Sequence, residues 1–94
     1  GVEESAPARF SLLQNFPNPF NPQTTIRYAV PEKGEVSLRI YDIRGELVAV
    51  LKDDIEDAGE RTAVWDASGN PSGVYFCRLK AGRISETTKL VLIR

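Results

Sequence analysis

The sequence contains no histidine and only one cysteine, Cys77. Histidine is the commonest general base and metal ligand near neutral pH, so its absence removes the usual routes to acid–base and metal chemistry. A single cysteine cannot form a disulfide within the chain. Two settings therefore stay open: a reducing compartment, or a secreted protein that does not use disulfides.

An excess of charge of either sign is also lacking. The 12 basic and 13 acidic residues are interspersed and leave a net charge of −1. Nucleic-acid binding needs a concentrated basic face, and attraction to an anionic membrane surface needs a polybasic segment, so we expect neither partner. No apolar run approaches the length that spans a bilayer, and no signal peptide is visible at the start of the chain.

Patterns that support catalysis are missing as well. The chain has no Ser/His/Asp set, no Cys/His pair, no phosphate-cradling glycine loop and no CxxC motif. We therefore predict that it is not an enzyme and has no catalytic residue, cofactor or metal site. Nothing beside Cys77 supplies a base, so this thiol is interpreted as a core residue.

One acidic stretch could in principle bind Ca²⁺ through oxygen ligands. It holds Asp53, Asp54, Glu56 and Asp57. The spacing does not fit an EF-hand loop, and Gly59 stands at the wrong offset. We interpret residues 53–59 as a solvated acidic loop.

Proline, in contrast, is concentrated at one place. Three of the six prolines fall in the proline segment, residues 16–22, which reads Phe16-Pro17-Asn18-Pro19-Phe20-Asn21-Pro22. Each proline fixes its own φ, donates no N–H and moves the preceding residue out of the α region. We expect an extended, semi-rigid bend that Phe16 and Phe20 pin to a core.

The residues before the bend mix Gly, Glu, Ala, Ser and Pro. Residues 1–9 are therefore predicted to be a linker from an upstream cargo domain. Because the first residue is Gly1 and not Met, we expect the chain to be a fragment of a longer protein.

After the bend the sequence indicates short strands. From Thr24 to Val30, β-branched and aromatic residues alternate with period two, which is typical of a half-buried strand. Strands are predicted over residues 10–14, 24–30, 35–42, 47–52, 60–66, 74–80 and 83–93. We predict an all-β fold over residues 10–94: an immunoglobulin-like antiparallel β-sandwich of about seven strands and a monomer. Its core is predicted to contain Ile26, Tyr28, Val36, Leu38, Ile40, Trp65, Tyr75 and Leu79.

One short stretch is similar to a known structural feature, and another has both a structural and a functional interpretation. Ser72-Gly73-Val74-Tyr75-Phe76-Cys77 is similar to strand F of immunoglobulin domains, where a tyrosine near the strand start forms the tyrosine corner. Trp65 could be an aromatic platform for a sugar. The alternative, which we favour, is a core anchor, with Asp66 capping the turn that follows.

The last six residues break the alternation. Lys89-Leu90-Val91-Leu92-Ile93-Arg94, residues 89–94, is called the tail below. One interpretation is a strand buried on both faces, with the two cations as gatekeepers. The other is a terminus that a partner reads, for instance by strand addition.

Taken in order, these stretches resemble a known family. The proline segment with Thr24-Thr25-Ile26-Arg27-Tyr28, the stretch Val36–Asp42 with Gly45, then Gly59, Trp65-Asp66, Pro71–Tyr75 and the tail resemble the type A C-terminal sorting domain of type IX secretion substrates. The sandwich is also similar to the immunoglobulin-like part of flagellar hook-capping proteins. Cys77 departs from the pattern, where an aromatic or β-branched residue is expected.

The resemblance implies a non-catalytic sorting signal. The cargo would fold in the periplasm, and an outer-membrane translocon would recognise this domain. A surface sortase would then cleave in or near residues 1–9 and anchor the cargo at the cell surface. The signal elements that the resemblance implies are Pro17-Asn18-Pro19, Gly73-Val74-Tyr75 and the tail: Lys89, Leu90, Val91, Leu92, Ile93 and Arg94. The alternative is an immunoglobulin-like accessory module of a secreted enzyme, either a spacer or a carbohydrate binder.

Overall fold

The computed structural model describes residues 12–94, with side chains from Asn15 onward, and contains seven strands and no helix in this range. The predicted linker over residues 1–9, with Phe10 and Ser11 of the predicted first strand, lies outside the described residues. The strands are β1 Leu12–Phe16, β2 Gln23–Val30, β3 Gly34–Tyr41, β4 Leu47–Glu56, β5 Gly59–Asp66, β6 Gly73–Ala81 and β7 Ile84–Leu92.

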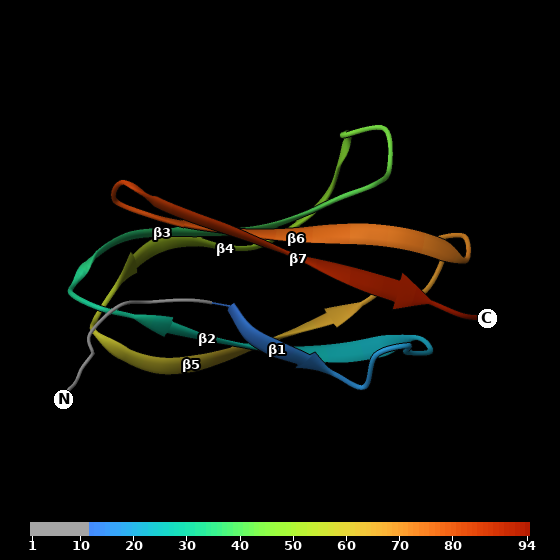
Figure 1. The fold of residues 1–94 in the computed structure, drawn as a ribbon, viewed down its shortest axis with the longest axis horizontal. Helices are drawn as coiled ribbons and strands as arrows, with labels where there is room; N and C mark the ends of the chain where they lie inside the picture. Colours follow the sequence, from blue (N-terminus) through green and yellow to red (C-terminus); the bar gives the residue numbers. More distant parts are fainter. Residues whose placement is uncertain (1–11) are drawn as a thin grey trace, which may run out of the picture.

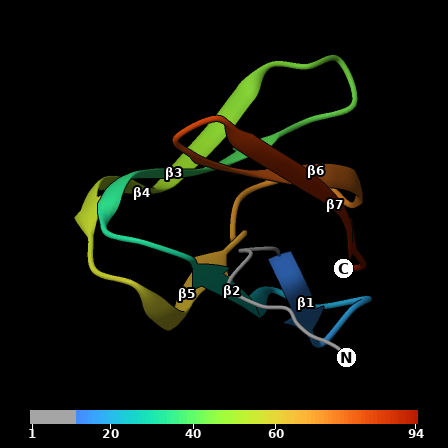
Figure 2. The same cartoon turned by 60° about the vertical axis from the view of Figure 1, so that its left-hand side comes forward.

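The strands form two antiparallel sheets that pack face to face. One sheet has the order β1-β2-β5 and the other has the order β4-β3-β6-β7. Figure 1 shows the two layers edge-on, and Figure 2 shows the same layers after a turn of 60°. The chain crosses between sheets after β2, β4 and β5, so neighbours in sequence are divided between the layers. The predicted all-β, immunoglobulin-like sandwich is confirmed.

The core follows from the period-two alternation of the strands. Burial alternates along β2 and β3, so every second side chain faces the opposite sheet. The resulting cluster contains all eight residues predicted as core, namely Ile26, Tyr28, Val36, Leu38, Ile40, Trp65, Tyr75 and Leu79. Phe20, Cys77, Leu90 and Leu92 belong to it too.

The prediction of an acidic loop over residues 53–59 is wrong. Asp53 to Glu56 continue β4, and only Asp57 and Ala58 separate this strand from β5. Because β4 is an edge strand, Asp53 and Asp54 can point to solvent without leaving the ladder. Charged side chains on an edge also discourage pairing with another chain.

Glu56 ends β4 with its carboxylate turned inward. Its Oε1 accepts a hydrogen bond from the Tyr28 hydroxyl at 2.9 Å, and Lys52 and Arg61 lie 3.3 and 3.7 Å from its oxygens. Burial, reinforced by this hydrogen bond, raises the pKa of Tyr28. The cluster joins β4 of one sheet to β2 and β5 of the other, which is why an acidic residue ends this strand in a buried position.

The entry to the proline segment also differs from the prediction. β1 runs past the predicted end at Gln14 to Phe16 itself, and Phe16 is 71% exposed. In a strand, successive side chains point to opposite faces, and Asn15 takes the buried one. Phe20 alone therefore anchors the bend in the core. The three peptide bonds that precede Pro17, Pro19 and Pro22 are cis.

Candidate functional site

The three stretches implied as signal elements meet at one end of the sandwich. This is the end on the right of Figure 1, where β1 leads into β2, β5 leads into β6, and the chain stops. Within the four-stranded sheet, Gly73, Val74 and Tyr75 of β6 pair with Leu92, Val91 and Leu90 of β7. From the other side, Phe20 forms a parallel bridge with Leu92. The tail thus lies between β6 and the proline segment.

Phe20 holds the tail through its backbone. The Phe20 N–H donates to the Val91 carbonyl at 3.0 Å, and the Ile93 N–H donates to the Phe20 carbonyl at 3.0 Å. Because β7 is the last strand of its sheet, these two bonds occupy an edge that would otherwise be open.

Asn18 extends this pairing with its side chain. Its Nδ2 donates to the Lys89 carbonyl at 3.3 Å, and its Oδ1 accepts from the Val91 N–H at 3.0 Å. One carboxamide thereby offers a donor and an acceptor to the tail, as a backbone peptide group of a neighbouring strand would. An asparagine between two prolines suits this role, since neither proline can donate an N–H.

The pairing changes both interpretations of the tail. A partner strand could add to the edge at Val91 and Ile93 only by displacing Asn18 and Phe20. Nor is the tail buried on both faces: Leu90 and Leu92 are in the core, Val91 is half-buried and Ile93 is 53% exposed. The alternation of buried and more exposed side chains continues to the end of β7. Within the apolar run, Leu90 and Leu92 face the core, whereas Val91 and Ile93 face outward.

Arg94 closes the tail onto the loop before β6. Its backbone N–H donates to the Ser72 Oγ at 3.0 Å, and its Nη1 donates to the Asn70 carbonyl. A further bond fixes the start of the proline segment, where the Thr24 Oγ1 donates to the Pro17 carbonyl at 2.8 Å.

The sequence predicts no role at this site for Thr24, Asn70 or Ser72. Only Thr24 carried a signal, as a polar residue on the inward face of a predicted strand. The hydrogen bonds that Arg94 donates to the Asn70 carbonyl and to the Ser72 hydroxyl depend on loop geometry that periodicity does not specify.

Three aromatic rings pack beneath this end. The Trp65 ring lies 5.6 Å from that of Phe20 and 5.2 Å from that of Tyr75, centroid to centroid, and the second pair meets edge to face. The Tyr75 hydroxyl donates to the Pro71 carbonyl, four residues upstream, at 2.6 Å. This is the bond of a tyrosine corner at the start of the strand, as the sequence predicted.

The aromatic packing also decides between the two interpretations of Trp65. Its side chain is 3% exposed, so its ring cannot serve as a platform for a sugar. Asp66 accepts hydrogen bonds from the Ser68 hydroxyl and the Ser68 N–H, which confirms the predicted turn cap. These bonds lower the pKa of Asp66.

Gly73 opens the second signal element with a backbone that other residues rarely adopt. Its φ is +151°, and the space where a Cβ would stand is empty. A side chain would therefore meet no neighbour, but the backbone conformation itself favours glycine. This turn positions Tyr75 for the hydrogen bond that its hydroxyl donates to the Pro71 carbonyl.

A family model described as "Secretion system C-terminal sorting domain" matches residues 14–94. The chain belongs to this family. A comparison with curated proteins found no match. The sorting domain is a signal for type IX secretion, its cargo is secreted or displayed at the cell surface, and the family is in general non-catalytic. The matched range includes all three signal elements.

The outer surface of this end of the sorting domain is a shallow hollow. It is lined by Pro17, Pro19, Phe20, Asn21, Ile93 and Arg94. Apolar side chains from two distant parts of the sequence are thus displayed together beside one cation. This hollow is where the proline segment and the tail can be contacted at once.

Metal binding and thiol chemistry have little support in the part of the chain that the structure describes. No cluster of three or more Cys, Asp and Glu side chains between residues 12 and 94 could hold a metal ion. Burial raises the pKa of Cys77 to about 12, so its thiol stays protonated at neutral pH. Within the same residues, no helix is long and apolar enough to cross a membrane.

Proposed function

We propose that the secretion machinery recognises the sorting domain as a folded unit, at the end where the proline segment, Gly73-Val74-Tyr75 and the tail meet. The observation that carries this proposal is the pairing of the tail along both edges, with β6 on one side and Asn18 and Phe20 on the other. In this arrangement the tail is an internal part of the fold and not a free peptide.

The signal residues then divide into two groups. Leu90, Leu92 and Tyr75 are buried, so they act by maintaining the fold. Asn18 and Gly73 shape it through a side-chain bridge and a turn. The signal residues available to a translocon at the hollow are Pro17, Pro19, Ile93 and Arg94, and Lys89 is exposed outside it.

The remaining steps follow the family. The cargo is covalently linked upstream of the sandwich and crosses the periplasm before the outer-membrane translocon binds the domain. A surface sortase then cleaves in or near residues 1–9. The domain acts as a monomer and performs no catalysis of its own. A compact sandwich suits this route, because it can stay folded during transport.

Export of a fluorescent protein tests the proposal directly. The reporter carries a Sec signal at its start and, at its end, either residues 1–94 or the tail alone, in a host that has the type IX machinery. We expect surface fluorescence with the complete chain and none with the tail alone. Export by the tail alone would show that a linear peptide is sufficient.

A pair of substitutions separates contact from folding. Ile93→Ser changes an exposed side chain of the hollow, whereas Leu92→Ser places a hydroxyl in the core. If the hollow is the contact surface, Ile93→Ser lowers export while the domain remains as stable as the parent. Normal export of a fully folded Ile93→Ser fusion would exclude Ile93 from the contact.

A further inference from the structure

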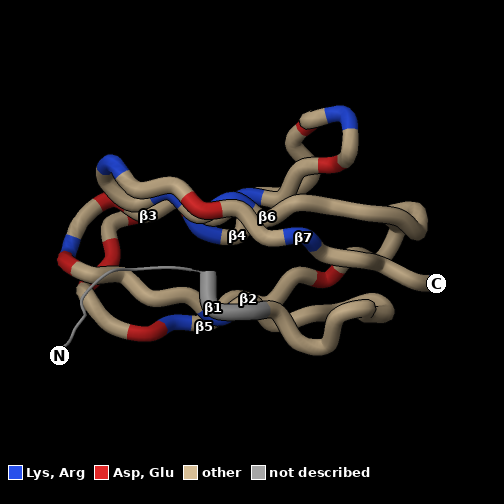
Figure 3. Tube along the Cα trace, viewed as in Figure 1, with Lys and Arg blue, Asp and Glu red and all other residues tan. Residues whose placement is uncertain are grey.

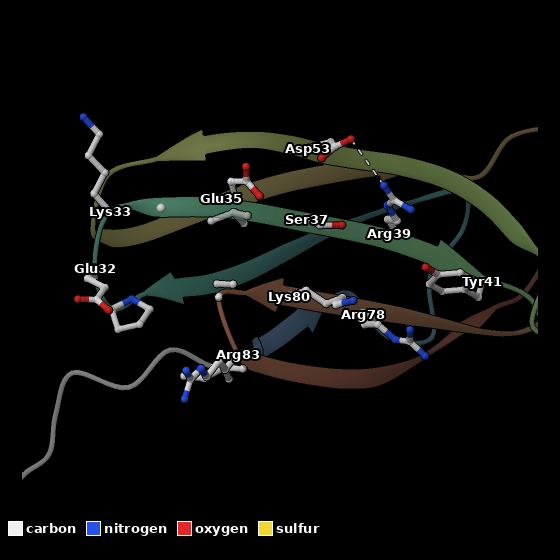
Figure 4. Close-up of a pocket in the computed structure, with 16 residues that line it drawn as sticks. Glu32, Lys33, Glu35, Ser37, Arg39, Tyr41, Asp53, Arg78, Lys80 and Arg83 are labelled. Carbon is white, nitrogen blue, oxygen red and sulfur yellow. Dashed lines mark ion pairs between the residues drawn. The ribbon is translucent and has the colours of Figure 1, made fainter.

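The outer face of the four-stranded sheet carries a second hollow. It is separate from the end of the sandwich where the proline segment, Gly73-Val74-Tyr75 and the tail meet, which is called the signal end below. Residues of β3, β4 and β6 form its floor and one side, and the β2–β3 and β6–β7 turns close one end. Its volume of about 720 Å³ lies within the range of small-molecule sites. Figure 4 shows Ser37, Arg39, Arg78, Lys80 and Arg83 around it.

Basic side chains are concentrated here although the whole chain has a net charge of −1. Arg39 and Arg78 are direct partners across β3 and β6, and Lys80 lies opposite Ser37 on the same face. Figure 3 shows basic positions gathered in the middle of this sheet. Like charges directly opposite each other on a sheet are destabilising, so this arrangement has a cost unless an anion offsets it.

The protein itself offsets only part of this charge, and least around Arg78 and Lys80. The β7 neighbours of Arg78 and Lys80 are Thr87 and Ser85, which carry no charge. Among the described residues, neither of these two cations has an ion pair, and Arg78 lies instead over the ring of Tyr41, 5.2 Å from its centroid. Glu32 and Glu35 also line the hollow, but toward the β2–β3 turn.

Arg39 is the one cation of the group with an acidic neighbour. Its Nη2 stands 3.6 Å from an oxygen of Asp53, a loose contact. Its Nε is buried and has no hydrogen-bond partner in the described part of the chain. A buried donor without a partner is uncommon, and an acceptor bound in the hollow would satisfy it.

We propose that this hollow binds a phosphate-bearing ligand through its phosphate group. The lining as a whole contains five basic and three acidic side chains, and its net charge of +2 matches a phosphomonoester better than one carboxylate. Guanidinium groups bind phosphate oxygens in pairs, Lys80 adds a point charge, and the Ser37 hydroxyl is a further donor. The volume exceeds that of one phosphate ion and leaves room for the group that bears it.

The test compares two double variants of the complete chain with the same net charge. Arg78→Gln with Lys80→Gln removes two cations from the hollow. Arg27→Gln with Arg44→Gln removes two exposed cations elsewhere, whose surface ion pairs contribute little to stability. Each protein is titrated with inorganic phosphate and with glucose 6-phosphate at constant ionic strength, and its amide resonances are followed by NMR.

We expect saturable shifts centred on Ser37, Arg39, Arg78 and Lys80 in the parent protein. Affinity should fall by about tenfold or more in the hollow variant and change by less than about twofold in the control. Unchanged spectra outside the hollow show that the hollow variant is folded. Equal losses in both variants, or no saturable shift with either phosphate, would overturn the proposal.

Two further probes identify the source of the phosphate and the alternative partner. Binding to phosphatidylcholine vesicles that contain phosphatidic acid, but not to phosphatidylcholine alone, would support a lipid headgroup. Tighter binding of glucose 6-phosphate than of these vesicles would support a soluble or polysaccharide-borne phosphomonoester. An oligoglutamate peptide that binds as tightly as the phosphates would contradict the proposal, because the hollow would then be a general site for acidic polypeptides.

Discussion

At the scale of single residues, the side chain of Trp65 packs beneath the signal end and supports it. It contacts Phe20 of the proline segment and Tyr75 of the second signal element, and so connects two stretches that are far apart in sequence. A change at this position removes packing from both. Its neighbour Val64 points outward and is exposed, so it provides a matched control on the same strand.

Replacing Trp65 with Ala should lower the free energy of unfolding by about 3–5 kcal/mol, and Tyr75→Ala should have a similar effect. The expected stability of a domain of this size is about 5–10 kcal/mol, so either change can unfold it at moderate temperature. Val64→Ala should change the stability by less than about 0.5 kcal/mol. Urea denaturation followed by circular dichroism measures all three. A Trp65→Ala variant as stable as Val64→Ala would refute the packing described here.

Cys77 makes the stability depend on alkaline pH. Its folded-state pKa is about 12 because the thiol is buried, whereas an exposed thiol in the unfolded chain titrates near its ordinary value. Above about pH 9 the unfolded state loses this proton first, so the free energy of unfolding falls by up to about 1.4 kcal/mol per pH unit. Below that pH the stability contribution is fully present.

Urea denaturation between pH 8 and 10 tests this dependence on the parent and on Cys77→Ala (a range of about two units around the ordinary thiol pKa). The variant should show the shallower fall, although its stability at pH 8 is lower because a cavity remains. Tyr28 is also buried with a raised pKa, but it begins to contribute only above its ordinary value. Identical slopes would mean that the thiol is accessible in the folded state.

At the scale of elements, the proline segment behaves as a short extra strand beside β7. Phe20 supplies the backbone bonds, and Asn18 substitutes a side chain where a backbone partner is missing. This joins the end of the three-stranded sheet to the edge of the four-stranded sheet. The bend predicted from the prolines therefore also holds the tail in place. Asn18, Phe20 and the tail residues that they bond are called the clasp below.

Asn18→Ala removes both of its bonds to the tail. We expect a loss of about 1–2 kcal/mol, because each exposed hydrogen bond contributes about 0.5–1.5 kcal/mol. The exchange of the Val91 amide hydrogen with solvent should then be faster by about 5–30-fold, while strands distant from this end change less. Amide exchange measured by NMR reports both. Asn21→Ala is the control, since Asn21 lies in the same segment and is exposed.

Protection of Val91 that is unchanged in Asn18→Ala would show that Phe20 alone holds the tail. Loss of protection in Asn21→Ala of the same size would show that the segment responds to any substitution.

The elements also show how far the sequence alone could lead. Period-two alternation predicted β2, β3, β5 and β6 to within a residue or two, because one face of each is apolar and one is polar. It failed for the second half of β4, where Asp53 and Asp54 have poor strand propensity but lie on an exposed edge. Glu56 was unpredictable in a different way: its burial depends on a hydrogen bond from Tyr28, which lies far from it in sequence.

The signal end was foreseen in part. The residues implied by the family resemblance are the ones that the fold brings together. The pairing of Asn18 with Lys89 and Val91 spans more than seventy residues, and no local pattern encodes it. The exposed position of Phe16 follows from the register of β1, which the prolines obscured.

At the scale of the whole molecule, the sorting domain places its features at different sites. The clasped tail and the hollow beside it lie at one end, the Glu56 cluster joins the sheets through β2, β4 and β5, and the basic hollow occupies an outer sheet face. If the proposed signal is confined to one end, the rest of the sandwich is free to provide stability. This separation predicts that changes in the basic hollow leave export through the signal end intact.

The central claim is that the folded clasp, and not the linear tail, is the sorting signal. Surface export of the reporter fused to the Asn18→Ala chain tests it most directly, with amide exchange of Val91 measured on the same variant and with Val64→Ala, an exposed position that lines neither hollow, as control. All tail residues are present in each fusion. We predict that Asn18→Ala lowers export together with Val91 protection, while Val64→Ala retains both. Export at the parent level from an Asn18→Ala fusion whose tail has lost its protection would contradict the claim.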